Sequence, residues 1–221
     1  MTEAVIVATA RSPIGRANKG SLVEMRPDDM SAQIVKALMD KVPQVKANDV
    51  EDLMLGIGQP AGEGGFNIAR VVAILAGLDD VPGVTVNRYC SSSLQTIRMA
   101  AHAIKAGEGD CFIAAGVETV SRYMTGASDT APNPIFKTPG ERTKLRAGGG
   151  QSNWTPPQGL PDYYIAMGQT AENVREIEGV TRQEMDEWGA RSQQRAVANQ
   201  QNGFFEREIT PLTLPNGTVV S

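Results

Sequence analysis

The sequence predicts an α/β fold in which helices cover a mainly parallel β-sheet. Two observations predict it. Over roughly the first 120 residues, short apolar runs rich in branched residues alternate with segments of helical apolar spacing. Each run has the length of a buried strand, and a strand reached through a helical crossover runs parallel to the strand before it in the same sheet. The expected strands are Ala4–Thr9, Leu53–Ile57, Val84–Asn87 and Cys111–Ala115.

Three helices are expected between these strands, each with apolar residues on one face. The first begins near Asp28–Asp29, because acidic side chains are favourable at the positive end of the helix dipole. The second has Asn67 as its expected N-cap and ends at Gly77. The third follows Cys90 and ends at Gly107.

The composition changes after this region. Residues 125–161 are rich in proline and glycine and lack hydrophobic periodicity. Helical spacing resumes over Asp162–Glu178, and a second helix opens with the capping-box pair Thr181 and Glu184 and ends near Gly203. We therefore expect a helical segment that is distinct from the strand-and-helix alternation before it.

A β-hairpin is expected at the end of the sequence. Ile209–Leu214 reads as a strand, and the Asn216-Gly217 pair is a strong hairpin turn signal. The chain then stops at Ser221, a few residues into the expected return strand. A strand that short cannot satisfy its backbone groups, so we expect this chain to be cut from a longer protein.

Composition narrows the functional classes. The chain has 21 basic and 25 acidic residues, a net charge of −4, which argues against nucleic-acid or anionic-membrane binding. No stretch approaches the roughly 20 apolar residues of a membrane span, and the N-terminus reads as a strand, not a signal peptide. The two cysteines, Cys90 and Cys111, lack metal-ligand or disulfide spacing. We therefore expect a cytoplasmic protein without a metal site.

Cys90 is the candidate nucleophile. It lies where a strand ends and a helix begins, and the unpaired amides of a helix start favour negative charge. Cysteines at such positions ionise more readily, and two amides there can face the oxygen of a tetrahedral intermediate. A small buried apolar side chain is the alternative on the local pattern alone. For Cys111, inside an apolar run, that alternative is the prediction.

The single histidine does not complete this site. His102 lies twelve residues along the same helix, which places it about 18 Å from Cys90. It is expected to be a helix-surface residue. Either the cysteine is inert, or its partner is a carboxylate, or the partner lies beyond Ser221.

Four ordered segments of the chain resemble the thiolase family, which includes acetyl-CoA acetyltransferases and 3-ketoacyl-CoA thiolases. They are Ala8–Gly15, Asn87–Leu94, Ala115–Arg122 and Met167–Asn173. The resemblance identifies Cys90 as the cysteine that is acylated. It also implies a thiolase-like fold, in which residues 1–120 form the N-terminal βαβαβαβ half with the nucleophile and residues 121–221 an incomplete, helical loop domain. The C-terminal half is absent.

The resemblance implies an acyltransferase that cleaves 3-ketoacyl-CoA with CoA, or condenses acyl-CoAs in reverse, through an acyl-enzyme on Cys90. Coenzyme A is then a substrate, no cofactor is bound permanently, and a homodimer or homotetramer is expected. The activating histidine and the second catalytic cysteine belong to the absent half, so this chain alone is predicted to be inactive. Met167 matches a methionine that lines the acyl and pantetheine pocket, although a plain core methionine is equally compatible with its spacing.

Within the family, a degradative thiolase is favoured by Ala166 in front of Met167 and by Arg88-Tyr89 in front of the cysteine. Two alternatives to a thiolase remain. A β-ketoacyl synthase also carries Cys-Ser-Ser-Ser-Leu, but other residues usually precede its cysteine. A non-catalytic thiolase-like fragment is the second alternative.

Overall fold

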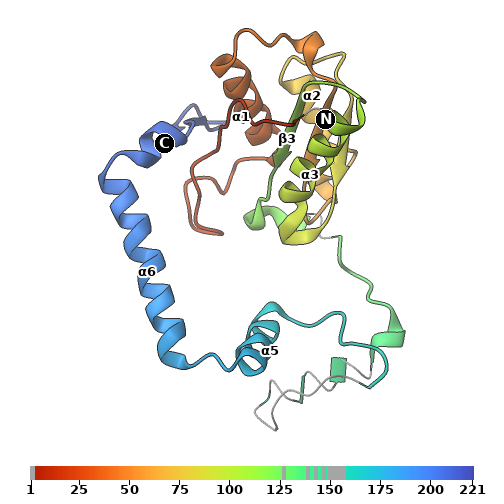
Figure 1. Ribbon diagram of the computed structural model, residues 1–221, viewed down its shortest axis with the longest axis vertical. Helices are drawn as coiled ribbons and strands as arrows, with labels where there is room; N and C mark the ends of the chain where they lie inside the picture. Colours follow the sequence, from red (N-terminus) through yellow and green to blue (C-terminus); the bar gives the residue numbers. More distant parts are fainter. Residues whose placement is uncertain (1–2, 126–127, 138–139, 142–143, 146–147, 149–157) are drawn as a thin grey trace. The chain divides into compact units, whose positions relative to one another are not determined.

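The computed structural model in Figure 1 describes residues 3–125, 128–137, 140–141, 144–145, 148 and 158–221. These residues form two compact units. The first contains the residues up to Ser128 together with Phe205–Ser221, and the second is Asp129–Phe204. Residues 205–221, which the sequence assigned to the loop domain, therefore pack with the first unit. The predicted domain boundary at residue 120 stays a prediction.

A three-stranded parallel sheet forms the centre of the first unit. Its strands are β1 (Asp52–Gly56), β2 (Gly83–Val86) and β3 (Phe112–Gly116), in the order β2-β1-β3. Leu53 and Leu55 of the middle strand are fully buried. Continuous apolar runs are typical of strands covered on both faces, and the three corresponding predictions are confirmed.

Helices cover both faces of this sheet, as the sequence predicts. Helices α1 (Pro27–Lys41) and α2 (Ile68–Leu75) pack together, and Ile68 and Val72 of α2 share a core cluster with Leu53 and Leu55. Because successive side chains of a strand point to opposite faces, Gly56 lies on the other face, where α3 (Ser92–Ala106) packs. Short 3-10 helices connect these elements: η1 (Ala47–Asp49), η2 (Gly62–Gly64), η3 (Tyr89–Ser91) and η4 (Val120–Thr125).

The start of α2 differs from the prediction in its capping. Asn67 occupies the N-cap position, but its backbone is left-handed and its side chain makes no cap hydrogen bond. The Thr85 hydroxyl of β2 accepts from the Ala69 amide at 3.2 Å instead, and donates to Asn67 Oδ1 at 2.8 Å. The sheet therefore supplies the cap. The other end of the helix follows the prediction, with Gly77 at a positive φ of 81°.

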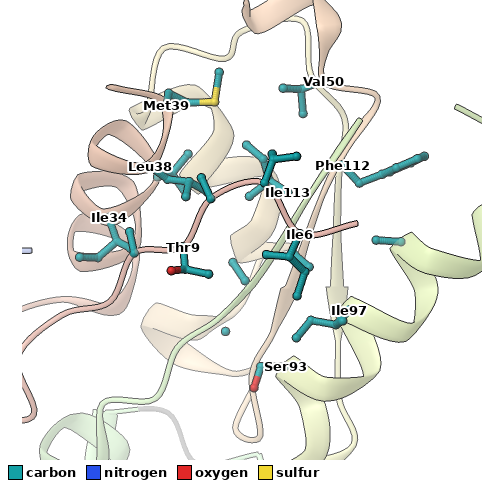
Figure 2. Close-up of a pocket in the computed structure, with 18 of the residues that line it drawn as sticks. Ile6, Thr9, Ile34, Leu38, Met39, Val50, Ser93, Ile97, Phe112 and Ile113 are labelled. Atoms are coloured by element: carbon teal, nitrogen blue, oxygen red, sulfur yellow. The ribbon is translucent and has the colours of Figure 1, made fainter. Parts of the chain in front are cut away.

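The first predicted strand is wrong. Residues 4–9 form no ladder in the described chain, and Val5, Ile6 and Val7 are 71–73% exposed. Figure 2 shows Ile6 and Thr9 between α1 and Ile97 of α3, where the segment lines a cavity of about 630 Å³ beside β3. Apolar content measures the tendency of a segment to be buried, whereas a strand also needs a partner in hydrogen-bond register. This segment lies near β3 without that register.

The predicted hairpin at the end of the chain is confirmed. Strands β4 (Leu212–Thr213) and β5 (Val219–Val220) pair antiparallel, and Gly217 takes the positive φ of 83° that the turn requires. The Gln33 side chain of α1 holds the hairpin, because its amide donates to the Thr213 carbonyl at 2.9 Å and accepts from the Thr213 amide at 2.8 Å. Helix α7 (Phe204–Glu208) precedes it.

The second unit is helical, as predicted. It contains η5 (Pro134–Phe136), α5 (Met167–Glu178) and α6 (Arg182–Gln201). Helix α5 begins at Met167 and not at the predicted Asp162, whereas the capping box of Thr181 and Glu184 is confirmed. The described helices of both units include none that is long and apolar enough to cross a membrane.

Candidate active site

Cys90 lies at the carboxyl edge of the parallel sheet. It is the middle residue of η3, which connects the end of β2 to the start of α3, and it is exposed. Ligands of open α/β sheets bind outside this edge. Cys111 differs: it is half-buried, and burial, with smaller contributions from Asp49 and Glu51, raises the pKa of its thiol. A thiol that resists ionisation is a poor nucleophile.

Two glycines let the first turn of α3 lie directly on the sheet. A Cβ on Gly56 would come within 2.5 Å of the Ser92 carbonyl carbon and 2.7 Å of the Ser93 amide nitrogen. Gly116, its register partner on β3, would place a Cβ 2.6 Å from the Ser93 Cβ. No side chain fits at either position, so the strand ends fix where the helix begins. Cys90, two residues before Ser92, is fixed with it.

Buried hydroxyl groups connect the same turn to its surroundings. The Ser92 hydroxyl donates to the Tyr89 carbonyl at 2.7 Å and accepts from the Arg88 amide at 2.8 Å. Thr96 is fully buried, and its hydroxyl lies 2.8 Å from the Ser93 carbonyl and 3.1 Å from that of Ala115 on β3. The serines that follow the cysteine therefore do more than cap a helix, because Ser92 closes the loop that carries the thiol.

Cys90 faces a cavity of about 550 Å³. Its lining comes from the strand ends, the cysteine loop and η4, and includes Gly58, Tyr89, Glu118 and Tyr123. Glu118 Oε2 accepts a hydrogen bond from the Gly58 amide at 2.9 Å. Glu118 belongs to Ala115–Arg122, one of the four segments that resemble the thiolase family, but the sequence predicted no role for it. No sequence feature pointed to Tyr123.

The Tyr123 phenol remains protonated beside the thiol. Burial first, and then its hydrogen bond to the Glu118 carboxylate, raise the pKa of Tyr123 far above its ordinary value, and the charge of Cys90 adds to the rise. A protonated phenol donates a hydrogen bond to Glu118. The cavity thus combines an exposed thiol with an ordered carboxylate–phenol pair.

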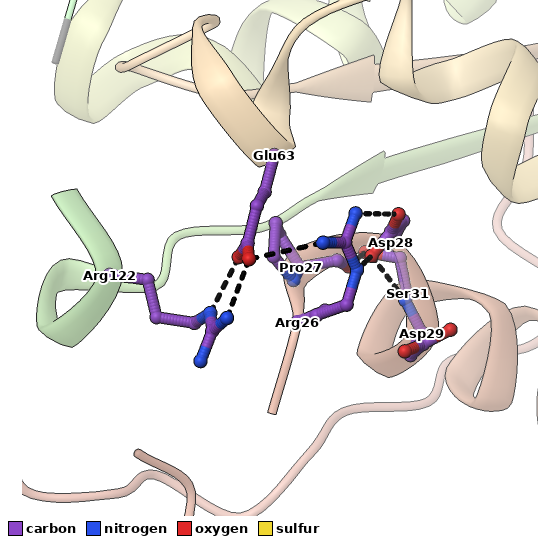
Figure 3. A network of polar contacts seen from close by, with 7 residues as sticks. All are labelled: Arg26, Pro27, Asp28, Asp29, Ser31, Glu63 and Arg122. Atoms are coloured by element: carbon purple, nitrogen blue, oxygen red, sulfur yellow. Dashed lines mark hydrogen bonds and ion pairs between the residues drawn. The ribbon is translucent and has the colours of Figure 1, made fainter. Parts of the chain in front are cut away.

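An ion-pair network fixes the 3-10 helix that carries Tyr123. Figure 3 shows Glu63 between two arginines: Arg122 of η4 meets it through two nitrogens, and Arg26 Nη1 lies 3.0 Å from Glu63 Oε1. Arg26 also meets Asp28 at 2.7 and 3.0 Å, and Asp28 accepts from the Asp29 amide at the start of α1. The network therefore joins η2, η4 and α1 beside the cavity.

Replacing Glu63 with glutamine is expected to lower the free energy of unfolding at pH 7 by about 1–3 kcal/mol, because charged hydrogen bonds are lost. The bonds from Arg122, against the opposing effect of burial, hold the pKa of Glu63 below its ordinary 4.5. The Glu63 carboxylate therefore binds a proton less readily in the folded state than in the unfolded state. The stabilisation by the ion pairs is fully present above the unfolded-state pKa of Glu63 and is lost as the pH falls through its folded-state pKa.

Urea unfolding of parent and Glu63→Gln at several pH values measures this difference, which is expected to shrink in acid. The control is Glu187→Gln on α6, whose exposed carboxylate accepts from Gln183 at 2.8 Å and should change stability by less than about 0.5 kcal/mol. A Glu63→Gln difference that is equal at pH 7 and in acid would contradict the network's role.

The other predicted residues, His102 and Met167, are not among those that line this cavity. His102 is exposed on α3, in agreement with its predicted place on the helix surface. Met167 is the first residue of α5 in the second unit and is 67% exposed, so it is no core methionine of that unit. Its contact with an acyl or pantetheine group stays a prediction.

Comparison with known proteins agrees with this geometry. A family model described as "Thiolase, N-terminal domain" matches residues 4–220. A 3-ketoacyl-CoA thiolase of Bacillus subtilis (strain 168) is 39% identical over 213 residues, which cover 96% of this chain and 49% of that protein. A beta-ketoadipyl-CoA thiolase of Acinetobacter baylyi is 41% identical over 219 residues, which cover 97% of this chain and 53% of that protein.

A third relative, the 3-oxoadipyl-CoA/3-oxo-5,6-dehydrosuberyl-CoA thiolase of Escherichia coli (strain K12), is 38% identical and aligns with 98% of this chain. The chain spans about half the length of these curated relatives. The family match covers nearly every residue, including the cysteine loop and both sheet glycines beneath it. The chain therefore belongs to the thiolase family, and it comprises the family's N-terminal domain.

Proposed function

We propose that this chain carries the acylated cysteine of a thiolase, an acyltransferase that cleaves 3-ketoacyl-CoA with CoA or condenses acyl-CoAs in the reverse direction. The observation that carries the proposal is the placement of Cys90: exposed, at the carboxyl edge of the sheet, before α3 and open to a cavity of about 550 Å³. The relatives named for 3-ketoacyl-CoA and beta-ketoadipyl-CoA support the same substrate class.

The proposed reaction has two transfers. The Cys90 thiol loses its proton to a base, its sulfur adds to the 3-keto carbon, and the C2–C3 bond breaks. The C2 carbanion takes up one proton and leaves as acetyl-CoA. The acyl group remains on the sulfur as a thioester. The thiol of a second CoA then loses its proton to a base and attacks this thioester, acyl-CoA leaves, and the proton returns to Cys90. Cofactor chemistry is not needed, because CoA is itself the reactant.

The base is expected from the second half that the relatives possess. His102, the only histidine of the 221 residues, is exposed on the helix that follows Cys90. A base must come within hydrogen-bond reach of the proton it takes. We therefore expect the 221-residue chain alone to catalyse no thiolysis. The homodimeric or homotetrameric state and the cytoplasmic location also stay predictions.

CoA-dependent consumption of acetoacetyl-CoA tests the proposal. The 221 residues continued by the second half of a relative are expected to cleave it, whereas the 221-residue chain alone should not exceed a blank without protein. Acyl groups on CoA and on acyl-carrier protein should be compared side by side. Turnover only with carrier-bound groups would refute the thiolase assignment in favour of a β-ketoacyl synthase, and thiolysis by the 221-residue chain would refute the expected need for a second half.

A further inference from the structure

An asparagine provides a second support for the loop that carries Cys90. Asn87 follows β2 directly, and its side-chain amide makes two hydrogen bonds in opposite directions. Nδ2 donates to the Gly58 carbonyl at 3.3 Å, and Oδ1 accepts from the Tyr89 amide at 2.8 Å. One side chain thus connects the segment after β1 to the residue immediately before the cysteine.

Tyr89 needs such support. Its φ is +47°, in the left-handed region that residues other than glycine rarely adopt. Backbone in this region persists only where surrounding contacts hold it, and such residues cluster at functional sites. Asn87 therefore contacts the strained residue directly, through the Tyr89 amide. The backbone conformation of Tyr89 sets the direction in which the chain continues from β2 to Cys90.

The other end of this connection is anchored as well. Gly58 is buried, and its amide donates to Glu118 Oε2 at 2.9 Å while its carbonyl accepts from Asn87. A Cβ on Gly58 would lie 3.1 Å from that carboxylate oxygen and 3.7 Å from the Tyr89 Cα, so the glycine permits both approaches. Glu118, Gly58, Asn87 and Tyr89 form a continuous series of hydrogen bonds that ends beside the thiol.

We propose that Asn87 is a positioning residue, which holds the Tyr89–Cys90 backbone so that the thiol faces its cavity, with Glu118 anchoring the series through Gly58. The proposal rests on the proposed function, in which Cys90 is the nucleophile. Asn87 does not touch the reacting atoms, so its effect is on the orientation of the thiol.

The chain offers a matched control for Asn87. Asn67, like Asn87, has a side chain that makes two hydrogen bonds, donating to the Gly83 carbonyl at 2.8 Å and accepting from the Thr85 hydroxyl at 2.8 Å. The contacts of Asn67 are with β2, whereas those of Asn87 are with Gly58 and Tyr89. Asn67 lies at the start of α2, and its two hydrogen bonds go to the sheet and not to the cysteine loop. Loss of either side chain removes the same chemical groups.

The experiment measures alkylation of the two cysteines by iodoacetamide at pH 7 in the 221-residue chain, with peptide mass spectrometry as the readout. The Cys90 rate is divided by the Cys111 rate, so that general loosening of the fold cancels. Asn87→Ala is expected to lower this ratio by about tenfold, the effect of losing one hydrogen bond's worth of free energy. Asn67→Ala is expected to leave it within about twofold of the parent, well inside the scatter of such contributions.

A second pair of variants applies if Asn87→Ala does not fold. Glu118→Ala and Glu118→Gln both remove the charge near the thiol, but only glutamine keeps an acceptor for the Gly58 amide. The Cys90 rate is expected to be lower in Glu118→Ala than in Glu118→Gln. The positioning role would be overturned if the ratio of Cys90 to Cys111 rates were the same in Asn87→Ala and Asn67→Ala and also the same in Glu118→Ala and Glu118→Gln. A faster Cys90 reaction in Asn87→Ala would overturn it as well.

Failure of this proposal is distinguishable from failure of the proposed function. Alkylation by a small reagent reports the placement of the thiol whether or not the protein is a thiolase. Acylation by acetyl-CoA of the chain continued by the second half of a relative reports the function, whatever the variants do. Acylation of that protein together with an unchanged alkylation ratio in Asn87→Ala would therefore reject the positioning role alone.

Discussion

Replacing Gly56 with alanine is expected to displace the first turn of α3 and to lower the free energy of unfolding by about 1–3 kcal/mol, the usual cost of overpacking. The added Cβ would stand 2.5 Å from the Ser92 carbonyl carbon and 2.7 Å from the Ser93 amide nitrogen. These are backbone atoms and cannot rotate away as a flexible side chain can. Either β1 or the helix must move, and the cysteine loop moves with the helix.

Urea unfolding measures the stability change, and alkylation of Cys90 relative to Cys111 measures the displacement of the loop. The free energy of unfolding and the ratio of Cys90 to Cys111 alkylation rates are both expected to change in Gly56→Ala. A variant with parent stability and a parent Cys90 rate would show that the helix is not seated by this glycine.

Gly189 in α6 provides the matched control. Nothing lies within 4 Å of the Cβ that an alanine would add there, and the residue is inside a helix. Alanine is a better helix former than glycine by about 1 kcal/mol, so Gly189→Ala should leave stability unchanged or raise it. It should not alter the reaction of Cys90. The same substitution is thus expected to have opposite effects at the two positions.

The sheet could be predicted because its strands are short runs rich in apolar and branched residues. The runs at Leu53–Ile57, Val84–Asn87 and Cys111–Ala115 each became a parallel strand within one residue of its predicted bounds. Burial differs among them, since β1 is buried at four of its five positions and β2 is half-buried throughout. The apolar character of Ala4–Thr9 predicted a strand that does not form, because apolar character does not specify a pairing partner. Helix ends set by local chemistry, such as Gly77 and the Thr181 capping box, were predicted from two or three residues.

The site could be predicted only where the chemistry is local. Cys90 was found because a strand end, a tight turn and a helix start are adjacent in sequence. Glu118 acts through the Gly58 amide, 60 residues earlier, and no spacing rule connects them. The cap of α2 comes from Thr85 for the same reason. Contacts between separate loops depend on how the sheet brings strand ends together, which a single sequence does not specify.

Cys90 is expected to be acylated by acetyl-CoA. The exposed thiol at the start of α3 should accept an acetyl group from acetyl-CoA when the chain is continued by the second half of a relative. Cys90→Ser removes the thiolate nucleophile, and we expect it to abolish the adduct. Cys111→Ser is the matched control, because that half-buried thiol has a raised pKa and should not be acylated.

Peptide mass spectrometry after incubation with acetyl-CoA locates the adduct directly. Cleavage after arginine and lysine places Cys90 in the peptide Tyr89–Arg98 and Cys111 in the peptide Ala106–Arg122. An acetyl group on Tyr89–Arg98 in the parent and in Cys111→Ser, and none in Cys90→Ser, is the predicted result. An adduct that persists in Cys90→Ser, or that maps to Ala106–Arg122, would contradict the assignment of Cys90 as the nucleophile.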